Sequence, residues 1–181
     1  MRAALAAALL FAAAASGLAE DPDPIPAGRP PEWSLAAGYG FSIRVNAGRA
    51  DEHLVLFEPG VSFRLGARLE YVVEGHFAGY FTPSGYMLGA VPVALRYSIG
   101  NGRILPYVMG GVGAGWTDLT GLDEISRRFN FLLEGAVGVR GALPNGQAWT
   151  IEWRWDHISN AGTVDPNLGL NASVFLLGWR F

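Results

Sequence analysis

The chain has 181 residues and a formal net charge of −3, 50% of its residues are hydrophobic, and it contains no cysteine. The mildly acidic balance argues against a basic patch for nucleic acid, and the lack of cysteine excludes disulfides and a lipid-modified N-terminal cysteine. Beyond residue 19 no run of about 18 apolar residues occurs, so the sequence predicts no membrane-spanning helix.

The N-terminus is typical of a secretory signal peptide. Arg2 supplies the positive end, and the apolar run Ala3 to Ala15 is too short to span a bilayer. Small residues up to Ala19 provide a cleavage site, so we expect residues 1–19 to be removed on export. Residues 20–31 are rich in proline and acidic side chains, which predicts an irregular lead-in.

From residue 32 onward apolar and polar residues alternate, and this period of two indicates β-strands. Eight strands are predicted, at about 32–43, 51–66, 67–82, 86–98, 103–116, 127–141, 147–159 and 171–181. An even number of strands in an exported, apolar chain favours an all-β fold, namely an eight-stranded antiparallel transmembrane β-barrel over residues 32–181. A soluble β-sandwich, whose apolar face would pack inward, is the alternative.

Three features favour the barrel. Aromatic residues recur near the predicted strand ends, as interfacial girdles require: Trp33, Tyr80, Phe81, Tyr97, Tyr107, Trp116, Trp149 and Trp179. The closing residues NASVFLLGWRF resemble the C-terminal strand by which bacterial outer-membrane barrels are recognised for assembly. Charged residues fall on the inner faces, where we expect ion pairs to fill the lumen: Arg64, Glu70, Glu74, Arg96, Glu134, Arg140, Glu152 and Arg154.

Turn and breaker residues add detail to this barrel. Asn145-Gly146 predicts a tight hairpin at the periplasmic end. Pro59 and Pro92 predict bulges or kinks in their strands. The glycine-rich segment 110–115, GGVGAG, follows no strand-to-helix pattern, so it is predicted to be a close-packed strand segment rather than a nucleotide-binding loop.

Polar residues interrupt the lipid-facing side of the seventh predicted strand. His157 and Ser159 continue the outward parity of the tryptophans that precede them. Asn171 has the outward parity of the last strand, and it lies at the same height as Ser159 if each strand crosses the membrane once. Antiparallel register therefore brings the three side chains together near the outer rim.

These residue types suit an activated serine. Ser159 would be the hydroxyl nucleophile, His157 the base, and Asn171 the group that fixes the imidazole ring. Asn160 and Gly162 follow the serine outside the strand, where their backbone N–H groups are placed to form an oxyanion hole. The alternative is a set of polar rim residues satisfied by water, since the H-x-S spacing is common by chance.

The stretch HISNAGTVDPNLGLN, residues 157–171, closely resembles the signature of the lipid A 3-O-deacylase (PagL) family, outer-membrane esterases with an eight-stranded barrel. The resemblance implies a serine esterase that removes the 3-O-linked acyl chain from the lipid A of lipopolysaccharide. It implies that Ser159 is the nucleophile and His157 the base. It also implies that Asn160 and Gly162 form the oxyanion hole and that Asn167 belongs to the active-site loop. Export, length, strand rhythm and the terminal aromatic residue also agree with this family.

Asn171 departs from the family pattern, which has a glutamate at this position. A neutral amide still holds the imidazole tautomer, but it stabilises the imidazolium less than a carboxylate does. A Ser-His-Asn arrangement resembles the outer-membrane phospholipase A family, which has a larger barrel and uses calcium. An outer-membrane phospholipase and a non-catalytic structural barrel are therefore alternative functions. Asp165, in the intervening loop, is a less favoured group for orienting His157 because it leaves the strand register.

The sequence predicts neither a cofactor nor a metal. His53 and His76 lie apart from the proposed catalytic residues, and no metal-binding motif occurs. The expected partners are lipopolysaccharide as substrate and the outer membrane of a Gram-negative bacterium, crossed several times by the chain, with no nucleic acid. A homodimer is an assembly that the sequence allows.

Overall fold

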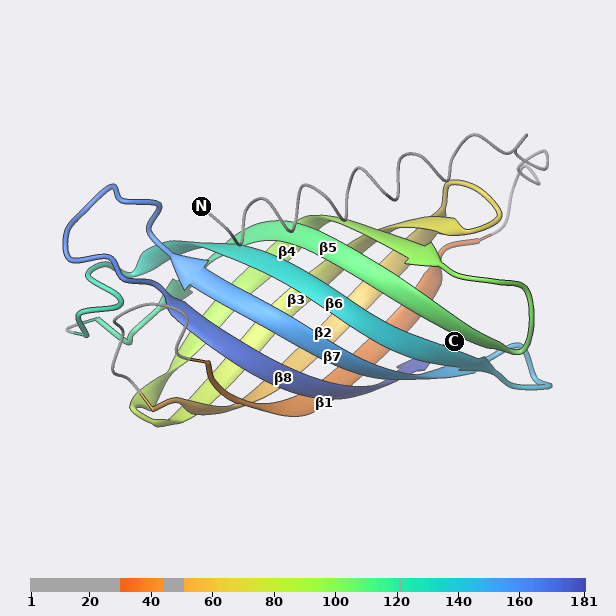
Figure 1. Cartoon of the computed structure of the whole chain (residues 1–181), viewed down its shortest axis with the longest axis horizontal. Coiled ribbons are helices and arrows are strands. Elements are labelled where there is room, and N and C mark those ends of the chain that lie inside the picture. Colours follow the sequence, from red (N-terminus) through yellow and green to blue (C-terminus); the bar gives the residue numbers. More distant parts are fainter. Residues whose placement is uncertain (1–29, 44–50, 121) are drawn as a thin grey trace.

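The computed structural model describes residues 30–43, 51–120 and 122–181, which form eight antiparallel strands closed into one barrel (Figure 1). The strands are β1 (Glu32–Ser42), β2 (His53–Arg64), β3 (Leu69–Thr82), β4 (Ser84–Ser98), β5 (Ile104–Thr117), β6 (Phe129–Ala142), β7 (Ala148–Ser159) and β8 (Leu170–Arg180). Each strand pairs with its sequence neighbours, and β8 closes on β1. The predicted barrel is confirmed, and every predicted strand end lies within two residues of the observed one.

The predictions for the N-terminal segment and for membrane-spanning helices concern parts of the chain other than the strands. The predicted signal peptide, residues 1–19, lies outside the described residues, as does the lead-in 20–31 except for its last two positions. Within the described part of the chain, no helix has the length and apolar character needed to cross a bilayer.

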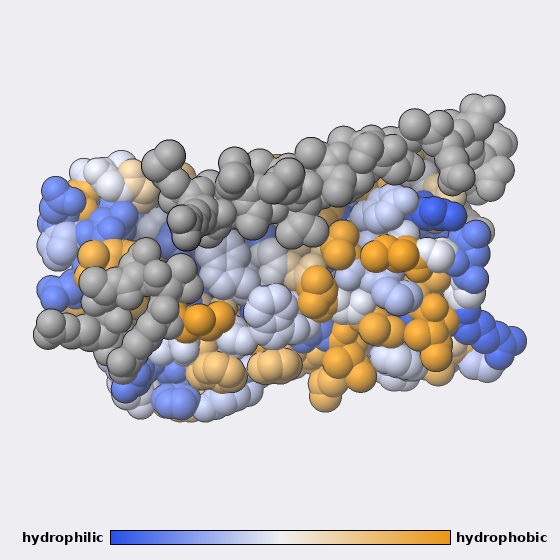
Figure 2. Space-filling model, viewed as in Figure 1, coloured by the Kyte–Doolittle hydropathy of each residue, from blue (hydrophilic) through white to orange (hydrophobic). Residues whose placement is uncertain are grey.

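The alternation of the sequence becomes the alternation of the barrel wall. Outward-facing Trp33 and Leu177 are exposed to 60% and 68%, whereas inward-facing Leu54 and Val72 are completely buried. Figure 2 shows hydrophobic side chains across the wall and hydrophilic ones at both ends of the barrel. An apolar outer band between polar rims is the surface that a bilayer requires. The sandwich alternative is excluded, because the eight strands form one closed barrel and large apolar side chains cover its outer wall.

Ion pairs fill the lumen, and the largest group of them surrounds Arg154 on β7. Its guanidinium lies within 3.2 Å of carboxylates from β2, β3, β6 and β7, namely those of Glu58, Glu74, Glu134 and Glu152. Arg154 itself is 1% exposed. Because these acids come from both sides of the barrel, the network exists only when the barrel is closed.

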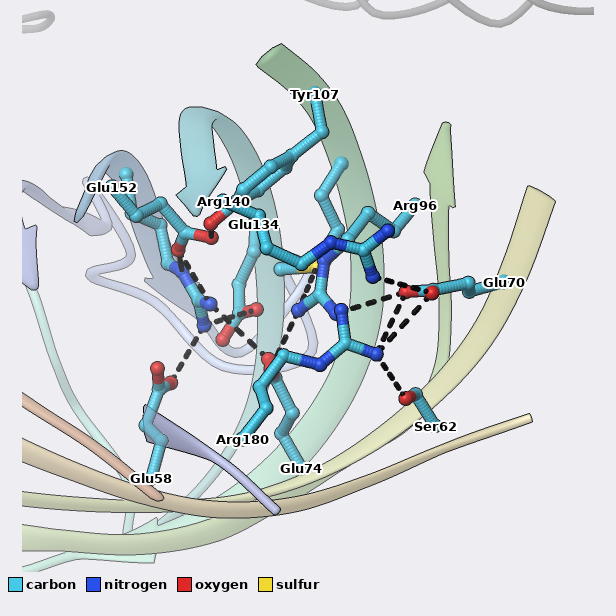
Figure 3. A network of polar contacts seen from close by, with 12 residues as sticks. Glu58, Ser62, Glu70, Glu74, Arg96, Tyr107, Glu134, Arg140, Glu152 and Arg180 are labelled. Atoms are coloured by element: carbon cyan, nitrogen blue, oxygen red, sulfur yellow. Dashed lines mark hydrogen bonds and ion pairs between the residues drawn. The ribbon is translucent and has the colours of Figure 1, made fainter. Parts of the chain in front are cut away.

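A second group of charges lies nearer the periplasmic end. The carboxylate of Glu70 contacts three guanidinium groups, those of Arg96, Arg140 and Arg180, at distances from 2.9 to 3.3 Å (Figure 3). The predicted plug of paired charges is therefore confirmed for the lumen. Arg64 is the exception, because it lies at the periplasmic rim, where it pairs with Glu32 and stays partly exposed.

Local details confirm some predictions and correct others. The hairpin at Asn145-Gly146 is present, with the Gly146 N–H donating to Leu143 O. Pro92 lies where the registers of β4 with both neighbours shift, as predicted. The prediction for Pro59 was wrong, because its ring packs against Gly75 and β2 keeps its register there.

Two of the predicted girdle aromatics were also assigned to the wrong face. Tyr80 and Tyr107 point into the barrel and are 4% and 3% exposed. The Tyr107 hydroxyl donates to the carboxylate of Glu152 at 2.8 Å. Both tyrosines have the inward parity of their strands, so their position near a strand end was the misleading signal.

Candidate active site

His157 and Asn171 form a directly opposed pair across β7 and β8. His157 Nδ1 lies 3.0 Å from Asn171 Oδ1. Since an amide oxygen only accepts, His157 must carry its proton on Nδ1, which leaves Nε2 with a lone pair. The predicted register is confirmed, and the pair gives the imidazole the tautomer that a general base needs.

The imidazole ring of His157 is packed on more than one side. The indole of Trp155 stacks on it, with ring centroids 5.7 Å apart and an angle of 17° between the planes. Asn171 is 6% exposed, while His157 and Ser159 are half-buried on the outer wall. The ring is therefore held in one orientation at the boundary between the wall and its surroundings.

Gly169 provides the space in which the imidazole lies. A Cβ at this position would lie 2.7 Å from His157 Cε1 and 3.4 Å from Nε2. Gly169 also has a φ of 73°, in the left-handed region, and its N–H donates to Glu124 O at 3.1 Å. Sequence analysis missed this residue, because a glycine just before a strand looks like an ordinary turn position.

Replacing Gly169 with alanine is expected to reduce hydrolytic turnover by about tenfold or more, because the new methyl group displaces the imidazole. Gly146→Ala, in the periplasmic hairpin, is the matched control: Gly146 also has a left-handed φ, 85°, but nothing lies within 4 Å of the added Cβ. Both variants carry the same backbone strain, so their difference in turnover isolates the contact with His157. Equal turnover in the two variants would refute this role of Gly169.

Ser159 ends β7 and pairs with Phe131 of β6. Its side chain shares the outward face with His157, but no hydrogen bond joins the two among the described residues. Cβ atoms two residues apart on a strand lie about 6–7 Å apart, so the hydroxyl reaches the imidazole only through a suitable rotamer. Hydrogen bonds between a nucleophile and its base are often long until substrate binds.

Asn160, directly after Ser159, is 1% exposed and ties the outer loops together. It makes hydrogen bonds of 2.8 to 3.0 Å with four residues. Its backbone N–H donates to Asn167 Oδ1, and its side-chain Nδ2 donates to Val164 O and Ser126 Oγ. Its Oδ1 accepts a hydrogen bond from the Thr163 N–H. The backbone donor that was predicted for the oxyanion hole is thus already occupied. The sequence could not reveal this bond, which depends on the loop's closure.

The chain turns sharply after Asn160. Ala161 and Gly162 both have left-handed φ values, 56° and 72°. A non-glycine residue in this region costs about 1–3 kcal/mol and occurs preferentially at functional sites. Both residues are exposed, and the Gly162 N–H makes no hydrogen bond within the described residues. It therefore remains available to an oxyanion.

The described residues between β5 and β6, 118–120 and 122–128, support the loop between β7 and β8, residues 160–169. The two loops lie together at one end of the barrel, at the left of Figure 1. Leu119 and Ile125 are buried in the barrel mouth, at 4% and 0% exposure, and anchor the first loop. Hydrogen bonds with Asn160 and Gly169 fix both ends of the β7–β8 loop against this anchored segment.

The remaining candidate residues lie elsewhere. Asp165 is exposed, and its carboxylate makes no hydrogen bond to His157 within the described part of the chain. His53 Nδ1 pairs with the Tyr39 hydroxyl on the outer wall, and β2, which carries His53, lies three strands away from β7. His76 is fully buried in the lumen. The geometry thus favours Asn171 over Asp165 as the residue that orients His157.

One group of residues in the lumen has the donor types of a metal site. Ligand atoms of Glu58, His76 and Glu134 lie within 4.8 Å of one another. The Arg154 guanidinium, however, already bridges these two glutamates, with Nη1 at 2.6 and 2.9 Å from their oxygens. A divalent cation would be repelled by this fixed positive charge, so the residues do not fit a metal.

Comparisons with known proteins agree with the fold and with the family resemblance. The family model described as "Lipid A 3-O-deacylase (PagL)" matches residues 37–180. The crystal structure of the outer membrane enzyme PagL is similar with a TM-score of 0.58 and 20% identity, covering 81% of this chain and 97% of that one. No curated protein sequence matches this chain.

Two further solved structures share the barrel. Neisserial surface protein A has a TM-score of 0.62 and 16% identity, covering 83% of this chain and 95% of that one. The N-terminal β-barrel domain of Pseudomonas aeruginosa OprF has a TM-score of 0.51 and 12% identity, covering 83% and 97%. At such identities these likenesses concern the fold alone.

Proposed function

Because the chain belongs to the lipid A 3-O-deacylase (PagL) family, we propose that Ser159, His157 and Asn171 catalyse its reaction, hydrolysis of the 3-O-linked acyl ester of lipid A. The protein is an enzyme of the Gram-negative outer membrane and acts on carboxylic esters. The observation that carries the residue assignment is the bond of 3.0 Å between His157 Nδ1 and Asn171 Oδ1, beside Ser159 on one outer face.

The proposed reaction has two steps. His157 Nε2 takes the proton of Ser159 Oγ while the oxygen attacks the ester carbonyl, and the imidazolium then protonates the departing 3-hydroxyl of the sugar. This leaves an acyl-serine. A water molecule, deprotonated by His157, attacks the acyl-serine, and the proton returns to Ser159 as the fatty acid leaves. Asn171 keeps the ring in place, and its amide stabilises the imidazolium less than a carboxylate would.

The oxyanion hole in this proposal differs from the one expected from sequence. Asn160 acts indirectly, because its N–H holds Asn167 through Oδ1. That bond directs the other end of the Asn167 amide, the donor Nδ2, away from Asn160. The Nδ2 group of Asn167 and the N–H of Gly162 are then the two donors for the oxyanion.

The position of the site on the outer wall supports a lipid substrate. Ser159 lies at the end of β7 opposite the periplasmic hairpin, so it lies at the outer leaflet, where lipopolysaccharide resides. Below it the wall exposes apolar side chains on β7 and β8, including Phe175 at 54% and Leu177 at 68%. This ridge provides a surface along which the acyl chain can lie while the ester reaches Ser159.

Expression of the chain in a Gram-negative host with unmodified lipid A is expected to lower the mass of that lipid A by one 3-O-linked acyl chain. Mass spectrometry of extracted lipid A measures the change, and cells carrying the empty vector are the control. Unchanged lipid A with accumulating lysophospholipid would indicate a phospholipase instead. No change in either lipid would indicate a non-catalytic barrel.

Assembly into a homodimer stays a prediction. Exposed apolar residues on β3 to β5, such as Phe77, Leu88 and Val112, leave a wall away from the catalytic strands on which a second barrel could pack in the membrane. Chemical cross-linking in membranes, which yields a band of twice the mass for a dimer, tests it.

A further inference from the structure

Two arginines stand beside the catalytic loop at the outer rim. Arg127 and Arg128 lie just before β6, and both are exposed. Among the described residues between the strands at this end, they are the only lysine or arginine residues. The acids there are Asp51, Glu52, Asp118, Asp123, Glu124 and Asp165. Positive charge at the described outer rim is therefore concentrated at one place, next to the β7–β8 loop.

The backbone of this arginine pair is rigid. Asn130 is completely buried, and its Nδ2 donates to the carbonyl oxygens of Arg127 and Arg128, at 2.7 and 3.2 Å. The carbonyl of Arg128 also accepts from the Thr117 N–H at 2.8 Å. The fold thus fixes the backbone of two residues whose charged side chains are exposed, an arrangement that preorganises them for a ligand.

The Arg127 side chain points toward the nucleophile loop. Its Nη1 donates to Thr163 Oγ1 at 3.0 Å, and that hydroxyl donates to Asn160 O at 2.9 Å. Asn160 is the residue directly after Ser159. One hydrogen bond therefore holds the guanidinium beside the catalytic segment, and the other N–H donors stay available.

We propose that Arg127 binds a phosphate group of lipid A and thereby places the sugar with its 3-O-acyl ester over Ser159. This inference rests on the proposed function. Lipid A is a phosphorylated glucosamine disaccharide, and a guanidinium binds phosphate through two parallel N–H bonds with defined geometry. Arg127 is then a specificity-determining residue, which touches the headgroup and takes no part in the chemical step. Arg128 lacks the bond to the catalytic loop and serves as the matched control.

Arg127→Gln and Arg128→Gln are compared with the unaltered chain on two substrates, phosphorylated lipid A and lipid A from which the phosphates have been removed. On the phosphorylated substrate, Arg127→Gln should lower kcat/KM by about 10- to 100-fold, the usual loss for a charge-assisted bond. On the phosphate-free substrate it should change kcat/KM by less than about twofold. Arg128→Gln should have a smaller effect on the phosphorylated substrate.

Several outcomes would overturn this assignment. An equal loss on both substrates would mean that Arg127 only supports the loop through Thr163. An equal loss in both arginine variants would mean a general effect of charge. If the unaltered chain cleaves neither substrate, the proposed function fails. The role of Arg127 is then tested by binding alone, with the detergent-solubilised chain and its Arg127→Gln variant each measured on the two lipids. Binding that is equal for both lipids, or unaffected by Arg127→Gln, would refute it.

Discussion

Replacing Ser159 with alanine is expected to reduce lipid A deacylation by about a thousandfold or more, while the barrel folds normally. The nucleophile is lost, and residues of a catalytic unit each cost nearly the full rate enhancement when removed. The measurement is the first-order rate of fatty acid release from lipid A in mixed micelles. The folded state is checked by the gel mobility shift that closed barrels show when samples are left unboiled.

For the same reason, His157→Ala should reduce deacylation nearly as much as Ser159→Ala does. The double variant Ser159→Ala/His157→Ala should be no slower than either single variant. Asn171→Ala should lose less, because the imidazole is still stacked on Trp155 and only its tautomer and orientation suffer. Additive losses from Ser159→Ala and His157→Ala would mean that the two side chains do not act together. Residual turnover in Ser159→Ala above a small fraction of the unaltered rate would require another nucleophile.

Replacing Arg154 with alanine is expected to cost about 3–5 kcal/mol of the free energy of unfolding, because it leaves buried carboxylates without their counter-ion. Four glutamates contact this guanidinium, and Arg154 is 1% exposed. Urea unfolding of the barrel in detergent or lipid vesicles, followed by tryptophan fluorescence, measures the loss. Arg64→Ala is the control, since its ion pair with Glu32 is partly exposed and should be worth less than about 1 kcal/mol.

A companion variant separates lost pairing from lost packing. Arg154→Met with Glu58→Gln and Glu134→Gln keeps much of the side-chain volume but removes two of the stranded charges. Its stability should lie above that of Arg154→Met alone. If neutralising Glu58 and Glu134 does not restore stability, Arg154 does not stabilise the barrel by balancing their charges.

Much of the fold could be predicted because the barrel follows a period of two. That period placed all eight strands, and it assigned His157 and Asn171 to one outer face before their register was known. The same rule predicted the inward charges of β3, β4, β6 and β7. Tyr107 was assigned to the outer girdle from its position near a strand end, and this was wrong, because its side chain lies in the lumen.

The residues that support the candidate site could not be predicted, because they depend on contacts that form only when the chain folds and that no local sequence pattern encodes. Asn160 and Asn167 are joined by a bond that needs the β7–β8 loop to close, and Gly169 matters because His157 occupies the space of its missing Cβ. Ser126 reaches Asn160 from a loop 34 positions earlier in the chain. Such contacts are set by tertiary packing, so the sequence indicated the candidate residues of the site but not the groups that hold them.

The inward and outward faces of strand β7 carry different kinds of residue. Its inward side chains, Glu152, Arg154 and Asp156, belong to the lumen network, and its outward ones end in His157 and Ser159. Inserting or deleting one residue would exchange the two sets, sending charges toward lipid and the imidazole into the lumen. This segment can therefore diverge among homologues by substitution, whereas its length is fixed. Changes in length should accumulate instead in the outer loops and periplasmic turns.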